Sequence, residues 1–298
     1  MFHFVPKPNL VNDCQAEYQR LDKIDEEQLA MEHISAPVDW PSFGHYFYFL
    51  FAPTLLYRDV YPRTERVRRR FLLTNLAQVV ASIFFGYLVL TTFIFPRFAE
   101  HFCLTWRSLL CHVFINSLPT LVVIMLAFFC FLHSWLNSWA EAMRFGDRLF
   151  YLDWWNGRTN QDYFRLWNVV VHNWLYTYVY RDLQLILLRR QRLLAAAVVF
   201  LLSASIHEYV MALSFGFCLP VMFIILGFFN FFLFSLSQQG LQGNLLYWLF
   251  LSILNSVTMM FYTMEWYARV NSTSGMKSFW FPETMRCGYK SPQAGVTK

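Results

Sequence analysis

An apolar stretch from Leu193 to Phe217 carries ionisable residues inside what is otherwise a membrane-spanning run. It is long enough for a transmembrane helix, and three arginines at positions 189, 190 and 192 mark its start. His207 and Glu208 lie within it. Because a charge at membrane depth is costly, such a residue usually faces a polar cavity or a partner. His207 is therefore either a proton-transfer group or a histidine held inside a helix bundle for structural reasons.

The composition excludes an ordinary soluble domain. Of 298 residues, 57% are hydrophobic and only 14% are charged, which favours a membrane protein. The net charge of +5 comes mostly from arginines that flank apolar runs, so membrane topology explains it better than nucleic-acid binding. The six cysteines show no zinc-ligand spacing. We expect a lipid bilayer as surroundings, no nucleic-acid partner and no metal site.

The apolar runs predict an all-α polytopic membrane protein with about five transmembrane helices. We place these spans at residues 72–95, 109–133, 193–214, 221–236 and 245–266. Residues 41–57 are aromatic, short and interrupted by Pro53, so we expect them at the membrane interface. Residues 134–192 combine many arginines with aromatics, a pattern typical of amphipathic helices on the cytosolic membrane face.

The charge pattern predicts a topology. The arginine-rich stretch from Arg58 to Arg70 indicates a cytosolic loop, and the polar, mostly acidic segment 1–40 is also expected in the cytosol. Five spans then place the tail, 267–298, in the lumen. The one Asn-X-Ser/Thr sequon, at Asn271, falls in this tail and agrees with that topology.

Two further stretches combine polar groups with aromatics. Phe150-Tyr151-Leu152-Asp153-Trp154-Trp155-Asn156 is either an aromatic belt at the membrane interface or part of a functional site. Arg165, Asn168 and His172 share one face of a predicted helix. They form either a polar stripe facing water or a wall of a reaction chamber.

The spacing around His207 fits a long substrate. Ser203 and His207 are four residues apart and share a helix face. Arg192 lies roughly 22 Å from His207 at about 1.5 Å per residue. A cofactor with phosphates at the surface, a pantetheine arm and a thioester at depth would fit. His207-Glu208 begins like H-E-x-x-H, but Met211 replaces the second ligand, which excludes a zinc protease.

Phe150 to Asn156 matches the FYxDWWN motif of the membrane-bound O-acyltransferase family, His207 its intramembrane histidine and Asn168 the accompanying amide. The chain therefore resembles that family over roughly residues 45–290. Within it, the stretches 51–59, 131–137, 203–209 and 265–269 are similar to the sterol O-acyltransferase (acyl-CoA:cholesterol acyltransferase) branch. The resemblance implies an acyltransferase region over 41–298 with a helical bundle of the type found in this family.

The resemblance implies transfer of a long fatty acyl group from acyl-CoA to a sterol 3-hydroxyl in the endoplasmic reticulum membrane, giving a steryl ester and CoA. His207 would be the general base, and Asn168 would donate a hydrogen bond to the thioester oxygen. No cofactor is expected beyond acyl-CoA as co-substrate, and a homo-oligomer is expected. Residues matching the family's acyl-CoA path are Asp162, Arg165, Asn168, His172, Tyr180, Arg192 and Ser203.

Two alternatives stay open. Diacylglycerol acyltransferases share FYxDWWN and the histidine, but they resemble residues 51–59 and 262–269 less well. The chain also resembles only the C-terminal part of such enzymes, so an inactive subunit that pairs with a full-length acyltransferase is the other alternative. Sterol enzymes often pair two lumenal cysteines near the C-terminus. Cys287 matches one, but Ser272 stands at the other position, so we expect no disulfide there.

Overall fold

The computed structural model describes residues 42–99, 106–157, 159–187, 191–235, 241–272 and 278–285. The chain divides into two compact units, Met1–Tyr48 and Phe49–Lys298. In the first unit the described residues are 42–48, which begin helix α2 (Phe43–Phe51). The predicted polar segment 1–40 and Cys287 lie outside the described residues. All sites discussed below belong to the second unit.

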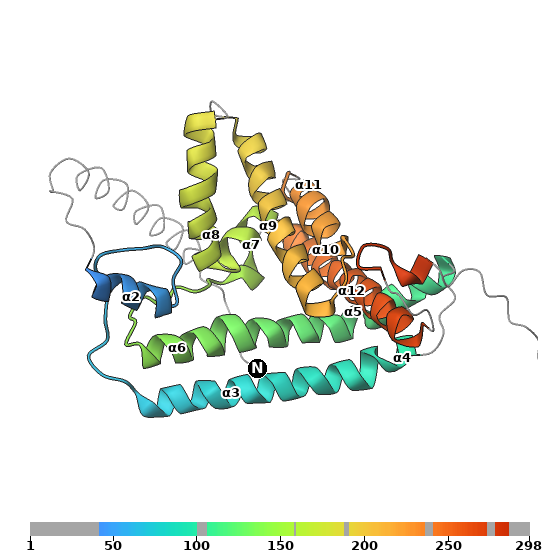
Figure 1. The fold of residues 1–298 in the computed structure, drawn as a ribbon, viewed down its shortest axis with the longest axis horizontal. Coiled ribbons are helices and arrows are strands. Elements are labelled where there is room, and N and C mark those ends of the chain that lie inside the picture. Colours follow the sequence, from blue (N-terminus) through green and yellow to red (C-terminus); the bar gives the residue numbers. More distant parts are fainter. Residues whose placement is uncertain are drawn as a thin grey trace, which may run out of the picture. The chain divides into compact units, whose positions relative to one another are not determined.

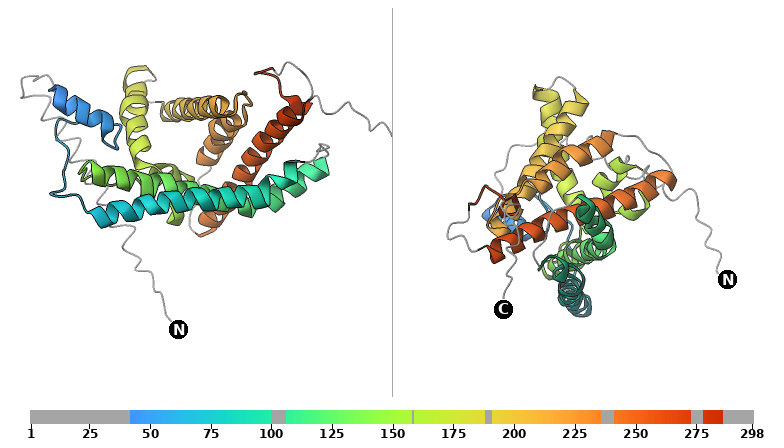
Figure 2. Two further views of the ribbon diagram at one scale, coloured as in Figure 1. Left: turned by 60° about the horizontal axis from the view of Figure 1, so that its bottom comes forward. Right: turned by 90° about the vertical axis from the view of Figure 1, so that its right-hand side faces the viewer.

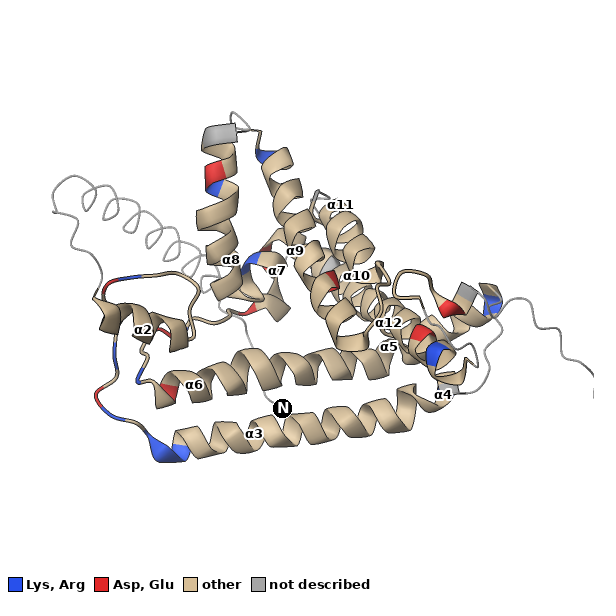
Figure 3. Cartoon of the chain, in the orientation of Figure 1, with Lys and Arg blue, Asp and Glu red and all other residues tan. Residues whose placement is uncertain are grey.

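The described part of the second unit is helical and contains no β-strand, which confirms the predicted all-α class. Four of its helices are long and apolar enough to cross a membrane, and they contain four of the five predicted spans. Charged residues lie mainly at helix ends and in loops (Figure 3). The four helices are Arg69–Phe98, Trp106–Ala142, Arg192–Phe215 and Gly243–Asn271.

The first two long helices run side by side (Figure 1). Polar groups join them: Ser134 Oγ lies 3.2 Å from Gln78 Oε1, and Glu141 is fully buried where they end. The second helix continues to Ala142, beyond the predicted end at 133, because Ser134 finds a partner on the first helix and Glu141 finds one at Arg68, directly before that helix. The segments are α3 (Arg69–Val89), η1 (Leu90–Ile94), α4 (Pro96–Ala99), α5 (Trp106–Phe128), η2 (Phe129–Trp135) and α6 (Leu136–Ala142).

Helix α12 (Leu241–Asn271) packs along α5. Ser256 Oγ donates to the carbonyl of Val113 at 2.7 Å, and Ser252 Oγ donates to that of Ser117 at 3.1 Å. Small polar side chains let membrane helices approach closely and bond across the interface. A buried apolar cluster lies at the same contact and consists of Ile94, Phe98, Val113, Met260 and Met264.

The fourth predicted span, 221–236, corresponds to a shorter apolar helix, Val221–Phe234. It comprises α10 (Val221–Phe223), η6 (Ile224–Phe229) and the start of α11 (Asn230–Ser235). At about 1.5 Å per residue it reaches roughly 20 Å, less than the ~30 Å hydrocarbon core. Its first turn bonds to Glu208 near the end of α9 (Arg192–Phe215).

The other end of this short helix lies at α7 (Asn160–Leu166), where Asn160 Nδ2 donates to the carbonyl of Leu233 at 2.8 Å. The helix therefore runs back along α9. Gly227 allows the close approach: a Cβ there would lie 3.3 Å from both Ala204 and Leu201.

Residues 134–192 supply no further candidate span within the described ranges. After α7 they form α8 (Val169–Leu175), η4 (Tyr176–Tyr180) and η5 (Leu183–Leu187). Segments η4 and η5 pack against α9, and Figure 1 shows α8 and α9 diverging from their connection. The two turned views of Figure 2 show α9, in yellow-orange, beside the orange helix that includes α11.

Candidate active site

His207 lies on an unbroken helix, so its distance along the axis from Arg192 follows as predicted, roughly 22 Å. Its Nδ1 lies 2.7 Å from the carbonyl oxygen of Ser203 and 3.5 Å from Ser203 Oγ. A carbonyl oxygen only accepts, so Nδ1 must carry the proton in this contact. In the neutral imidazole, Nε2 then has a free lone pair. The His207 side chain is exposed.

Glu208, the next residue, lies on the buried face of α9. Tyr262 Oη is 3.0 Å from both of its carboxylate oxygens and 3.1 Å from the carbonyl of Leu219. The backbone N–H of Phe223 donates to Oε2 at 3.2 Å. These contacts fix the rotation of α9 about its axis and thereby the direction of His207.

Asn168 is the N-cap of α8. Its Oδ1 accepts from the backbone N–H of Val171 at 3.2 Å, which satisfies one of the orphan donors at a helix start. With Oδ1 in this contact, Nδ2 is left as a donor, and no described residue accepts a hydrogen bond from it. An amide held in this way can donate to a developing oxyanion.

The FYxDWWN segment holds Asn168 in place through its backbone. The N–H of Val169 donates to the carbonyl of Phe150 at 3.0 Å, and that of Leu152 donates to Leu166 at 2.9 Å. Phe150 is 1% exposed. The backbone of the motif therefore positions the turn that carries Asn168.

Trp154 is the centre of an aromatic cluster that joins α5, α7 and α12. It is 2% exposed, and its ring centroid lies 4.7 Å from that of Trp167, 5.1 Å from Phe128 and 5.5 Å from Trp248. Such contacts each add roughly 0.5–1.5 kcal/mol beyond burial. The motif is thus part of the packed core, whereas Asp153, Trp155 and Asn156 are exposed at its edge.

Tyr151 connects this motif to η2. Its hydroxyl lies 2.7 Å from Nδ1 of His133. Burial, assisted by the nearby Asp153 charge, raises the pKa of the Tyr151 hydroxyl, so it stays protonated near neutral pH. Neither the sequence motif nor its spacing indicated this contact, because it joins two separate elements.

Asp162 has local partners. With Thr159 it forms a capping box at the start of α7, with contacts of 3.0 and 3.2 Å, and its Oδ1 lies 3.6 Å from Arg165. His172, Tyr176 and Tyr180 stack one above another, with centroids 6.3 and 5.7 Å apart. The three stacked rings therefore lie on one face of the helical segment formed by α8 and η4.

Six predicted site residues lie on two packed helical segments, with Asn168, His172 and Tyr180 on α8–η4 and Arg192, Ser203 and His207 on α9. Asp162 and Arg165 lie on α7 instead. The structure brings Ser203 and His207 into contact. No hydrogen bond joins Asn168 to His207 in the described residues. Those residues also contain no group of three or more His, Cys, Asp and Glu side chains able to hold a metal.

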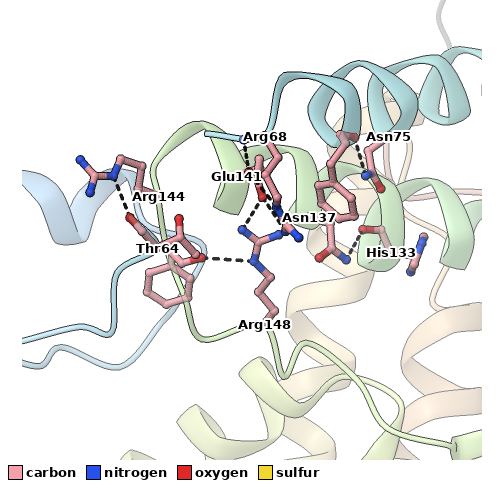
Figure 4. Close-up of polar contacts among 10 residues, drawn as sticks. Thr64, Arg68, Asn75, His133, Asn137, Glu141, Arg144 and Arg148 are labelled. Carbon is pink, nitrogen blue, oxygen red and sulfur yellow. Dashed lines mark hydrogen bonds and ion pairs between the residues drawn. The ribbon is translucent and has the colours of Figure 1, made fainter. Parts of the chain in front are cut away.

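Sequence reasoning missed a buried ionic cluster where α3 and α6 meet (Figure 4). Glu141 accepts from Arg148 Nη2 at 2.6 Å and from Arg68 Nη2 at 2.9 Å, and this contact raises the pKa of Arg68. Arg144, at φ 57°, bonds Thr64 through its Nε. A lone carboxylate at the end of an apolar run was the available signal.

Comparison with known proteins finds sterol O-acyltransferases among the relatives of this chain. Sterol O-acyltransferase 2 of Mus musculus is 42% identical over 253 residues, which cover 83% of this chain and 48% of that protein. The Homo sapiens form is 42% identical, covering 80% and 47%. Sterol O-acyltransferase 1 of Cricetulus griseus is 41% identical, covering 80% and 45%. The chain thus spans about half the length of the curated relatives it matches.

The profile of the MBOAT, membrane-bound O-acyltransferase, family matches residues 15–264. This range includes FYxDWWN, Asn168 and His207, the three features on which the resemblance was based. The chain belongs to the membrane-bound O-acyltransferase family.

Proposed function

We propose that this chain forms part of an acyl-CoA-dependent sterol O-acyltransferase of the endoplasmic reticulum membrane. The relatives named as sterol O-acyltransferases support the sterol as acceptor. The observation that carries the chemistry is the hydrogen bond from His207 Nδ1 to the Ser203 carbonyl, because it leaves Nε2 free to take a proton.

In the proposed reaction, Nε2 of His207 removes the proton of the sterol 3-hydroxyl as its oxygen attacks the thioester carbon. The C–O bond forms and the C–S bond breaks, and the proton on Nε2 passes to the departing thiolate. The products are a steryl ester and CoA. The Ser203 carbonyl stabilises the imidazolium that exists between the two proton transfers, since it accepts from Nδ1 throughout.

Asn168 is proposed to donate from Nδ2 to the thioester oxygen as negative charge develops there. One such preorganised donor is worth roughly 3–4 kcal/mol in the transition state. The cap contact to Val171 N–H supports this role, since it fixes the amide orientation before substrate arrives.

Acyl-CoA is proposed to lie along α8–η4 and α9, with its phosphates near Arg192 and its thioester near His207. The roughly 22 Å between these residues suits an extended pantetheine arm. Arg165, His172, Tyr180 and Ser203 would line the path. Asp162 is part of the proposal as well, although its Oδ2 already accepts from Thr159 N–H in the capping box and its Oδ1 pairs with Arg165.

The test is a competition assay in microsomes prepared from host cells that express the protein and have no steryl ester synthesis of their own. Labelled oleoyl-CoA is offered with a sterol and diacylglycerol together. Label is expected mainly in steryl ester. Label mainly in triacylglycerol would overturn the sterol assignment, and no labelled ester above the level of untransformed microsomes would overturn the proposed activity of this chain.

A further inference from the structure

Residues 278–285 fold back along the last turns of α12. Arg269 Nη2 donates to the carbonyl of Phe281 at 3.1 Å. Glu265 accepts from the backbone N–H of Glu283 at 2.8 Å and from that of Thr284 at 3.1 Å. The Thr284 hydroxyl adds a bond of 2.9 Å. The segment thus runs beside the helix that precedes it.

These contacts fix the depth of the segment relative to the membrane-spanning helix. The helix that is long enough to span a membrane ends at Asn271, so Arg269 and Glu265 lie about 3 and 9 Å before that end. Its 29 residues reach roughly 44 Å, about the thickness of a bilayer with its headgroup regions. The interfacial layer on each side of a bilayer is about 5–8 Å thick. The segment therefore reaches the depth of that layer, and its inner end approaches the hydrocarbon boundary.

Polar groups of α12 satisfy the backbone at this depth. Glu265 is fully buried and pairs with Arg269 at 2.6 Å, whose guanidinium lies 4.7 Å from the Phe217 ring centroid. The N–H of Cys218 donates to the carbonyl of Phe279 at 3.0 Å. Backbone in or near lipid is stable only when protein satisfies it, as here.

Two aromatic side chains of the same segment project away from the protein, and a third is partly exposed. Trp280 is 71% exposed and Phe281 is 70% exposed, while Phe279 is 38% exposed. Trp266 and Val270, on the last turns of α12, are also exposed apolar residues. The aromatic loop therefore continues the apolar surface of a membrane-spanning helix.

We propose that Phe279, Trp280 and Phe281 form an aromatic anchor whose partner is the phospholipid bilayer at the boundary between headgroups and acyl chains. The amphipathic ring of Trp280 favours that layer, and the apolar rings of Phe279 and Phe281 favour its acyl-chain side. Glu265 and Arg269 are the positioning residues, because they hold the backbone so that the rings project outward. This anchor does not depend on the proposed acyl transfer.

The test uses 5-fluorotryptophan-labelled protein in phosphatidylcholine nanodiscs. The fluorine line lost in Trp280→Phe reports Trp280, and Trp154, which is 2% exposed, gives a buried reference line assigned in the same way. A lipid spin-labelled near its headgroup is expected to broaden the Trp280 line more than a water-soluble gadolinium chelate does. Stronger broadening by the chelate, or broadening by neither reagent, would overturn the anchor.

A second pair of variants tests the positioning by Glu265. Thr284→Ala removes one bond to Glu265, whereas Thr258→Ala removes a hydroxyl that bonds only the carbonyl of Leu254 within α12. Broadening of the Trp280 line by the lipid label is expected to fall in the first variant alone. Equal broadening in both variants would contradict the positioning by Glu265.

Discussion

His207 and Glu208 are neighbours on α9, yet they lie in opposite environments. Both carboxylate oxygens of Glu208 contact Tyr262, and one also accepts from Phe223 N–H. His207 bonds only to Ser203, in the preceding turn of its own helix, and keeps Nε2 free of described partners. An ionisable group at membrane depth is thus structural where every polar atom is paired, and available for chemistry where one is not.

Helix rotation separates the two roles. One residue turns the side chain by about 100°, so the face that carries Glu208 cannot also carry His207. Ala204 and Ala212, one turn to each side of Glu208, are buried on its face and allow close packing. Substitutions on the His207 face should therefore change turnover, and substitutions on the Glu208 face should change thermal stability.

The largest effect is expected for His207→Ala. Loss of the proposed general base should lower turnover by about 10²–10⁴-fold while the variant still inserts and folds. Steady-state turnover, normalised to folded protein, checks this. Ser205→Ala is the matched control, since Ser205 is exposed on the same helix and bonds the carbonyl of Leu201. Near-normal turnover of His207→Ala would remove this residue from the mechanism.

Asn168→Asp separates capping from catalysis. Aspartate still accepts from Val171 N–H, so α8 should keep its N-cap, but the donor is lost. Turnover should fall about 10²–10³-fold with little change in melting temperature. Asn173→Asp, at a half-buried position on the same helix, serves for comparison. Retained activity in Asn168→Asp would contradict the oxyanion role and leave the cap as its only function.

Tyr262→Phe tests the structural face of α9. It leaves Glu208 without its hydroxyl partner and should cost about 1–3 kcal/mol of folding free energy. Thermal unfolding in detergent measures this loss. Tyr209→Phe is the control, because Tyr209 is 64% exposed. A fall in turnover per folded molecule without a lower melting temperature would break the contrast between the two faces.

The smallest effect is expected for Arg192→Gln. Arg192 is exposed, so losing one charge-assisted contact to a phosphate should cost at most about 1 kcal/mol, equivalent to roughly fivefold. The KM for acyl-CoA should rise with kcat unchanged, and the difference should shrink at high salt. Arg181→Gln, which removes a surface pair with Asp182, should leave KM unchanged. Equal effects of the two variants would argue against a phosphate site at Arg192.

The sequence alone predicted four helices that are long and apolar enough to cross a membrane, and it predicted that Ser203 and His207 share a helix face. Both depend on local information, namely apolar run length and four-residue spacing. The capping box of Thr159 and Asp162 could also have been found in this way. Local spacing was enough because each of these features lies within a single helix.

The rotation of α9 and the partner of Glu208 could not be predicted. A helix that is apolar on all sides has no periodic pattern to show which face packs. Tyr262 lies 54 residues further along the chain. The packing of Trp154 was missed for a similar reason, since an aromatic belt and an aromatic core have the same composition. Such contacts depend on tertiary packing between elements.

The free Nε2 of His207 is the central claim, and nitrogen NMR of histidine-labelled protein in lipid tests it most directly. The signals that disappear in His207→Gln belong to His207. For the neutral imidazole we predict a protonated Nδ1 and an unprotonated Nε2. A protonated Nε2 with a bare Nδ1 would contradict the hydrogen bond to Ser203 and the proposed base together.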